Sequence, residues 1–190
     1  FSTSVDRDPV NNAGKLTNET QRASVRLVGR DGLRQNIAAA AEKRDTYAVE
    51  LAYKAGPVQL QAEYASSQYD VFTAAANNKP ASTADQQVDT AYVQASYFVT
   101  GQQRIYDFKK GIFKAPKVES GAGALELKAR YDMIENKDTN AEGVQYMVGA
   151  NYYFNPNVRL MLEYVNGTAT STAGVDTEAS AIQTRLQFGF

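Results

Sequence analysis

A repeated alternation of apolar and polar residues constrains the fold of this chain more than any other feature. In the last run, Leu186, Phe188 and Phe190 share one parity, whereas Arg185 and Gln187 share the other. Side chains alternate between the two faces of a β-strand, so such a strand places one face against an apolar medium and the other against water. The alternation returns clearly in residues 47–53, 58–64, 125–131 and 158–164, and more weakly in 23–29, 92–99 and 146–154.

We predict about eight strands from this pattern, each near the roughly ten residues that a tilted strand needs to cross a bilayer. No stretch has sustained helical periodicity, and the one helix-like piece, residues 37–43, falls between predicted strands. Mean hydropathy is -0.45, and no apolar run approaches the roughly eighteen residues of a transmembrane helix. A closed barrel is the other architecture that satisfies its backbone inside lipid. The predicted fold is therefore all-β, a transmembrane antiparallel β-barrel, with residues 1–190 as one domain.

The connections between these strands alternate in length, which predicts an orientation. Residues 54–57 and 154–157 read as tight turns, whereas the longer links span residues 30–45, 66–87, 136–143 and 167–178. Outer-membrane barrels have short periplasmic turns and longer external loops. Counting strands back from a periplasmic C-terminus puts both tight turns in the periplasm and all four longer links outside. The exception is the link 100–123, which is long and yet falls on the periplasmic side.

Aromatic residues of the apolar parity fall at the strand ends, and Leu, Val and Ala fill the middle. The external ends carry Tyr47, Tyr64, Tyr131, Tyr146 and Tyr164, and the periplasmic ends carry Tyr53, Tyr97, Tyr152, Phe154, Phe188 and Phe190. Two aromatic girdles around an apolar band suit a bilayer, because amphipathic rings prefer the headgroup level. The alternative, a soluble barrel or sandwich, would concentrate its aromatic residues in mid-strand. We therefore expect the outer membrane of a Gram-negative bacterium, with its lipid and lipopolysaccharide as partners.

Several segments resemble one known family. They are residues 47–53 with 56–64, residues 92–101, residues 106–116 with a Lys-Lys-Gly-x-Phe core, residues 155–164 and the terminal residues 185–190. In this order they are similar to the C-terminal half of the phosphate-selective porin O/P family. The resemblance implies half of a sixteen-stranded barrel, a homotrimer, and passive diffusion of small anions, phosphate or polyphosphate among them.

The polar parity of the strands carries more basic than acidic residues. Pointing inward by alternation are Arg22, Arg26, Arg30, Lys128, Arg130, Arg159 and Arg185, against Glu50, Glu63, Glu126 and Glu163. Rings of Arg and Lys make a pore favour anions, and the planar guanidinium fork suits phosphate oxygens. The alternative is that these charges solvate a water-filled wall and pair across strands. We interpret the seven basic residues as candidate pore-lining, anion-binding groups.

A second basic group lies in the long link 100–123. It consists of Arg104, Lys109, Lys110, Lys114 and Lys117, offset only by Asp107 and Glu119. Aromatic residues interleave with these charges, but the run lacks any recognised nucleic-acid-binding module, so no nucleic-acid partner is expected. The link is predicted to fold toward the pore mouth and to draw anions by its local field. The alternative is a solvated basic loop.

The chain lacks several residue types that commonly carry out catalysis. The chain has no His and no Cys, which removes a Ser-His triad, a thiol nucleophile and a His-based metal site. We therefore predict a protein that is not an enzyme and that has no cofactor and no metal. An outer-membrane barrel lipase is the enzyme alternative, and the absent His counts against it.

The predicted function is passive diffusion of small anions through an outer-membrane pore. The alternative is a small, closed eight-stranded barrel that serves as a structural anchor or adhesin. The two differ in whether the first strand bonds to the last. We expect no such closure, because eight strands leave room only for packed side chains, among which the excess of Arg and Lys would be costly.

Overall fold

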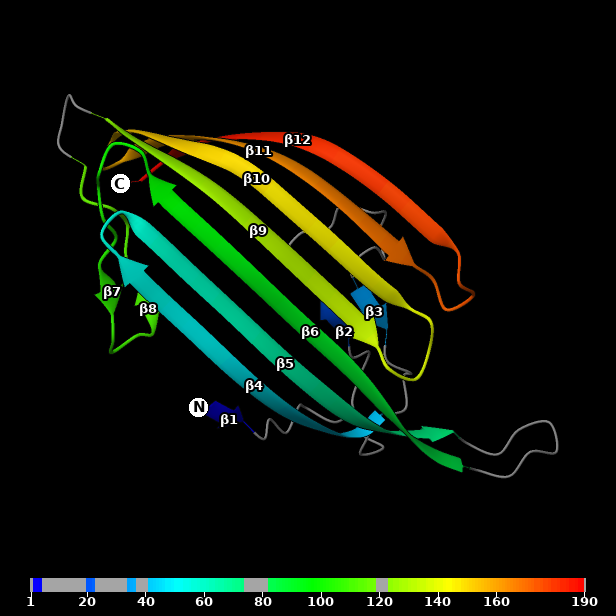
Figure 1. Cartoon of the computed structure of the whole chain (residues 1–190). Helices are drawn as coiled ribbons and strands as arrows, with labels where there is room; N and C mark the ends of the chain where they lie inside the picture. The colour runs from blue at the N-terminus through cyan, green and yellow to red at the C-terminus, as the bar shows by residue number, and fades with distance from the viewer. Residues whose placement is uncertain are drawn as a thin grey trace.

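The computed structural model describes residues 2–4, 20–22, 34–36, 41–73, 82–118 and 123–189, with side chains in 44–70, 84–118 and 123–189. These residues form β-strands joined by turns and loops (Figure 1). Among them there is no helix long and apolar enough to cross a membrane. The all-β fold class predicted from the alternation is confirmed.

Most strands belong to one antiparallel sheet of eight strands. In spatial order these are β1 (Ser2–Ser4), β4 (Ala41–Ala55), β5 (Val58–Thr73), β6 (Ser82–Phe98), β9 (Ala124–Asn136), β10 (Glu142–Asn155), β11 (Val158–Thr170) and β12 (Asp176–Phe188). Two short ribbons stand apart from this sheet: β2 (Thr20–Arg22) with β3 (Arg34–Asn36), and β7 (Tyr106–Asp107) with β8 (Ile112–Phe113). From β4 to β12 each strand of the sheet neighbours the next one along the chain, which is an up-and-down meander.

Seven predicted strands correspond to β4, β5, β6 and β9 to β12, but they are longer than expected. β5 and β6 extend well into the predicted link 66–87, and β11 extends into the link 167–178. The helix-like reading of residues 37–43 is wrong for residues 41–43, which begin β4. Cross-strand pairing of Ala41 and Lys43 with β5 overrides the helical preference of this short segment. The strand predicted over residues 23–29 lies outside the described residues, and β1 occupies the place beside β4.

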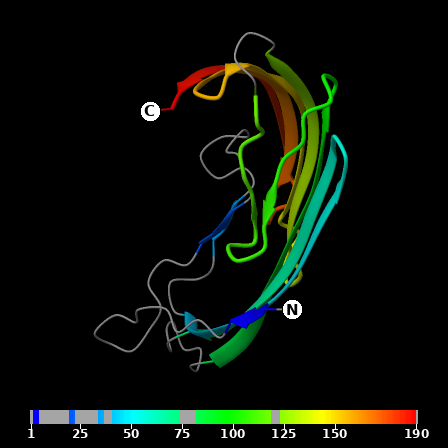
Figure 2. The same cartoon turned by 90° about the vertical axis from the view of Figure 1, so that its left-hand side faces the viewer.

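The sheet is strongly curved, and both ribbons lie on its concave side (Figure 2). β1 and β12 are its edges, and each has a single neighbour among the described strands. The turns at Gly56–Pro57 and Pro156–Asn157 and the end of β12 lie at one end of the strands, named here the turn end. The connections from β5 to β6, β9 to β10 and β11 to β12 lie at the opposite end, named the loop end.

The two faces of the sheet have opposite chemistry. On β10, Tyr146 and Val148 are exposed on the convex face, whereas Gln145 and Asn151 are buried on the concave face. β9 follows the same rule, with exposed Leu127 and buried Glu126, whereas the edge strand β12 is exposed on both faces. An apolar face turned outward and a polar face turned inward is the arrangement of a barrel that meets lipid outside and water inside.

Aromatic side chains form two rows on the convex face. Toward the loop end, Tyr131 lies directly across from Tyr146. At the turn end, the rings of Tyr152 and Phe154 meet edge to face at 4.9 Å, and Phe188 lies across from Val158. All of these aromatic side chains are exposed. Their placement at two levels along the strands is that of interfacial girdles.

The tight turns follow from local chemistry. Gly56 has φ +54°, a left-handed conformation in which a side chain is strained. At the second turn, the side-chain oxygen of Asn155 accepts hydrogen bonds from the backbone N–H groups of Asn157, at 2.8 Å, and Val158, at 3.0 Å. This Asx turn replaces ladder bonds that the chain gives up when it reverses.

The concave face is buried in two places. Near the loop end Tyr69, Val88, Ile134 and Val165 are almost fully buried. At the turn end a small core joins Phe98, Val118, Ala124 and Tyr153. Between these two buried regions the polar wall remains open to a hollow.

Candidate functional site

The link between β6 and β9 folds back from the turn end along the concave face (Figure 2). Its base is fixed by backbone bonds, from the Val99 N–H to the Leu125 carbonyl at 2.9 Å and from the Leu125 N–H to the Thr100 hydroxyl at 3.0 Å. The described part, residues 99–118, carries the β7–β8 hairpin. A long connection at the turn end therefore places its basic residues beside the polar wall.

The hairpin is held in shape by Asp107. Its Oδ1 accepts hydrogen bonds from the backbone N–H groups of Lys109, at 3.0 Å, and Lys110, at 3.3 Å. Its Oδ2 forms an ion pair with the Lys114 ammonium at 3.0 Å. The hydrogen bond from Lys114 and those from the two N–H groups hold the pKa of the Asp107 carboxyl below its usual value. Lys114, predicted as an anion ligand, is thus neutralised at the base of the hairpin.

Arg104 is also neutralised. Its Nη2 donates to both carboxylate oxygens of Glu126, at 3.0 and 2.9 Å, and its Nε donates to Oε1 at 3.1 Å. The Oε2 of Glu126 also accepts from the Asn151 amide and the Tyr153 hydroxyl, each at 2.8 Å. Burial alone would lower the pKa of the Arg104 guanidinium, but the hydrogen bonds and charge of Glu126 raise it overall, so Arg104 stays charged.

Two wall cations pair with carboxylates as well. Lys128 on β9 forms an ion pair with Glu163 on β11. Arg130 holds Asp132 in a forked ion pair at 2.7 to 3.0 Å and lies 3.9 Å from the centre of the Tyr92 ring. It also donates to Gln94 at 2.8 Å. Lys128 and Arg130 are therefore held by neighbouring side chains of the sheet and are largely shielded from solvent.

Arg159 and Arg185 differ from the other wall cations. Arg159 donates twice to one oxygen of Gln187, at 3.0 and 2.7 Å, and lies over the Tyr153 ring. Arg185 lies across from Met161 on the neighbouring strand, one diagonal step from Arg159 on the same face. Within the part of the chain that the structure describes, neither guanidinium pairs with a carboxylate. The same holds there for Lys109, Lys110 and Lys117 of the link.

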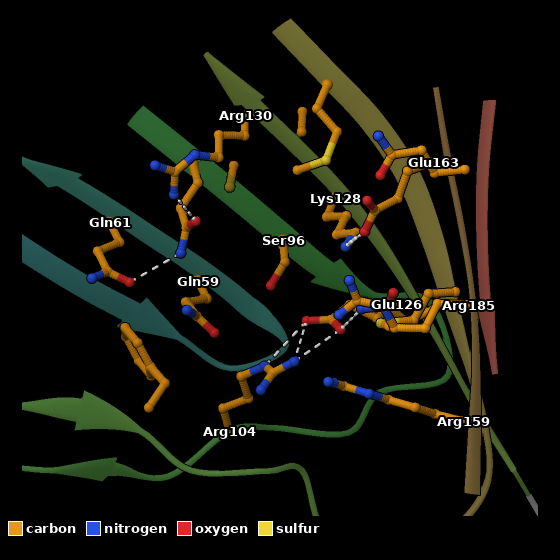
Figure 3. A pocket seen from close by; sticks show the side chains of 18 of the residues that line it. Gln59, Gln61, Ser96, Arg104, Glu126, Lys128, Arg130, Arg159, Glu163 and Arg185 are labelled. Atoms are coloured by element: carbon orange, nitrogen blue, oxygen red, sulfur yellow. Dashed lines mark hydrogen bonds and ion pairs between the residues drawn. The ribbon is translucent and has the colours of Figure 1, made fainter. Parts of the chain in front are cut away.

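A hollow of about 620 Å³ separates the hairpin from the wall (Figure 3). Arg159, Arg185 and Lys128 line it on one side, and a row of amides lines the other. In that row Gln94 donates to Gln61 at 3.0 Å, and Gln61 donates to the Tyr92 hydroxyl at 2.9 Å. From the hairpin, residues 111–113 complete the lining. The hollow thus offers two unpaired guanidinium groups opposite neutral amides.

The predicted site residues are therefore not equivalent. Of the nine predicted cations whose side chains the structure describes, five lack a carboxylate partner among the described residues and four are paired with one. Arg22 lies in β2, outside the main sheet, so the alternation of that sheet does not decide its direction. Arg26 and Arg30 lie outside the described residues. Sequence reasoning missed Asp132, because the predicted strand ended at residue 131, although Asp132 shares the parity of Arg130.

The fold and this site define a class of protein: an antiparallel β-sheet with an apolar convex face and a polar concave face, the arrangement of an outer-membrane β-barrel. The family model for phosphate-selective porin O and P matches residues 12–190. The chain belongs to this family, as its segments 47–53, 56–64, 92–101, 106–116, 155–164 and 185–190 predicted. None of the curated proteins compared with the chain matches it. The family is one of channels rather than of enzymes. Among the described residues there is no group of three or more Asp or Glu placed to hold a metal ion.

Proposed function

We propose that this protein is a porin of the Gram-negative outer membrane that conducts small anions, phosphate among them, by passive diffusion. The observation that carries the proposal is the sorting of charges on the concave face. Arg104, Lys128 and Arg130 are each paired with a carboxylate, whereas Arg159 and Arg185 face the hollow without one. Unpaired guanidinium groups are the ones available to an anion.

The chemistry of this pair suits oxyanions. A guanidinium donates in a planar fork that matches two oxygens of a phosphate, and charge-assisted bonds of this kind are short and strong. Gln187 and the Tyr153 ring fix the head of Arg159, which reduces the entropy lost on binding. Conduction also requires that the anion be released. The neutral amides on the other side of the hollow add no charge attraction that would slow this release. Polyphosphate would bridge the pair and the hairpin lysines, which we propose as a second cargo.

The wider assembly is also a proposal. Among the described strands, β1 and β12 each have a neighbour on one side only, and edge backbone groups left without partners would be costly in lipid. We propose that they join further strands of a sixteen-stranded barrel, that three barrels associate, and that the turn end faces the periplasm. Lipid and lipopolysaccharide would cover the convex face. The anchor or adhesin alternative needs closure of eight strands on themselves, and among the described strands β12 bonds to β11 alone, which does not favour it.

Planar bilayers test the proposed function directly. Phosphate added to the full-length protein in chloride should lower the single-channel current, because bound phosphate occupies the passage. Arg185→Gln should weaken this block about tenfold, the equivalent of one charge-assisted hydrogen bond. Lys137→Gln is the matched control, because it removes one positive charge at the loop end, where Lys137 pairs with Glu135. Equal block in the parent protein, Arg185→Gln and Lys137→Gln would contradict the proposal.

A further inference from the structure

We propose that Glu126 is a positioning residue that latches the link to the pore wall and thereby keeps Lys109 and Lys110 inside the passage. The inference rests on the proposed function, since it concerns how Lys109 and Lys110 are held where the anions pass. It assigns Arg104 to the latch and removes it from the set of anion ligands.

The geometry of Glu126 supports this role. Its side chain is 2% exposed, and its two oxygens accept from Arg104, Asn151 and Tyr153. Two of these partners belong to β10 of the wall, whereas Arg104 belongs to the link. Breaking a buried ion pair is strongly destabilising because it leaves an uncompensated charge, and Arg104 is the cation that pairs with Glu126 among the described residues.

Arg104 in turn joins both arms of the link. It lies on the arm that leads into the hairpin, and its Nη1 reaches the Lys114 carbonyl on the returning arm at 3.5 Å. Its Nη2 also donates to the Tyr153 hydroxyl at 2.8 Å. Among the described residues of the link, Arg104 is the one that forms an ion pair with the wall. Other attachments of the described link are the backbone bonds at its base, the bonds of the Thr100 hydroxyl and the Gln102 amide to the start of β9, and the packing of Val118 in the turn-end core.

The hairpin beyond the latch has few contacts of its own with the wall. Phe108 at its tip is 89% exposed, and Lys109 and Lys110 beside it are exposed as well. The hairpin is internally rigid, because Asp107 bonds its backbone and Tyr106 packs against Phe113 at 4.9 Å. A rigid hairpin on a single charged latch moves as a unit. Loss of the latch would therefore withdraw both lysines together.

A double-mutant comparison in the full-length protein tests this. In the parent protein, Lys109→Gln with Lys110→Gln should lower the anion-over-cation permeability ratio measured from reversal potentials at low salt. In a Glu126→Gln background the same two substitutions should lose most of that effect, because the lysines have already left the passage. Glu135→Gln is the matched control, a Glu→Gln change on the same strand at the loop end, and it should leave the lysine effect intact.

A thiol probe provides a readout that does not depend on anion selectivity. In a Phe108→Cys variant, a bulky methanethiosulfonate reagent should block most of the current when the hairpin is latched, and little of it when Glu126→Gln is added. If Glu126→Gln fails to assemble, Arg104→Lys serves instead, since an ammonium keeps the charge but cannot form the fork.

The outcomes separate the two proposals. Equal lysine effects with and without Glu126, together with unchanged thiol block, would overturn the latch. Thiol block that depends on Glu126, but without phosphate block of the parent pore, would support the latch and contradict the anion function.

Discussion

Arg130 and Asp132 lie two residues apart on β9 and form a forked ion pair, with Nη2 2.7 Å from Oδ1 and Nε 3.0 Å from both carboxylate oxygens. Alternation turns both side chains to the concave face, so the strand supplies a cation together with its own neutraliser. The concave face can therefore carry arginine without a net positive charge at the position of Arg130. This pairing separates the cations that shape the passage from those that are free to meet an anion.

Removal of this whole pair should therefore change little. Arg130→Gln together with Asp132→Asn deletes equal and opposite charges, and we expect phosphate block within about threefold of the parent protein, less than 1 kcal/mol. Lys128→Gln with Glu163→Gln should behave in the same way. Phosphate titrations of single-channel current provide the measurement. A neutral pair deletion that weakens block as much as Arg185→Gln would show that the paired cations also bind anions.

The hairpin lysines should act through a long-range field. Lys109→Gln with Lys110→Gln should reduce anion selectivity most at low salt, because exposed charges are screened over about 10 Å at 0.1 M ionic strength. Lys114 is left unchanged, since its pairing with Asp107 makes it part of the hairpin itself. Reversal potentials over a range of salt concentrations measure the effect. A reduction that stays the same from low to high salt would mean that the lysines act by direct contact instead.

The hairpin should resist moderate acid. The pKa of Asp107 is held below its ordinary value of 3.8 by Lys114 and the backbone N–H groups. A carboxyl with a depressed folded-state pKa stabilises the fold above its ordinary pKa, and this contribution is lost as pH falls through the lower value. The lysine-dependent selectivity should thus persist from neutral pH down to about 3.8 and decline below it. Asp107→Asn should lose that selectivity at neutral pH, as reversal potentials would show.

Orientation can be read from labelling of whole cells. Cysteine at Thr172, in the loop-end connection before β12, should react with a membrane-impermeant thiol reagent, because we propose that this end faces outward. Cysteine at Asn157, in the turn before β11, should not react. Both positions are exposed in the structure, so a difference reports on sidedness. Labelling of Asn157 alone would reverse the orientation.

Gly123, where the link enters β9, should be intolerant of a side chain. Its φ is +65°, and an added Cβ would lie 2.6 Å from the Tyr152 hydroxyl and 3.3 Å from the Tyr153 carbonyl. Gly123→Ala should lower the free energy of unfolding by about 2 kcal/mol, from backbone strain together with the clash. Gly101→Ala is the control, because Gly101 has φ +84° but nothing within 4 Å of the added atom. Urea unfolding of both variants in detergent would test this. Equal losses in the free energy of unfolding would mean that backbone strain alone accounts for the effect and that the clash adds nothing.

Local pattern was enough to predict the fold class and most of the strands. The period of two along β10 assigns Tyr146 to the convex face and Gln145 to the concave face without any knowledge of neighbouring strands, since alternation is a property of the strand alone. Tight turns at Pro57 and Pro156 were equally readable, because they depend on a few adjacent residues. The ends of the strands were harder to predict from the sequence. β5 continues past residue 66 and β6 begins before residue 87 because each strand supplies the ladder partners of the other, and that mutual support is not visible in either segment.

The sequence alone also determined which residues of the long strands β4 to β12 of the main sheet lie on its concave face, but not which of them lack a carboxylate partner there. Lys128 and Arg185 follow the same alternation, yet only tertiary structure places Glu163 beside the first and leaves the second across from Met161. The same holds for Arg104 and Lys109, which lie in one basic run and differ only because the fold brings Glu126 to Arg104. Coulombic pairing depends on distances of a few ångströms between residues far apart in the chain, and the register and curvature of the sheet set those distances.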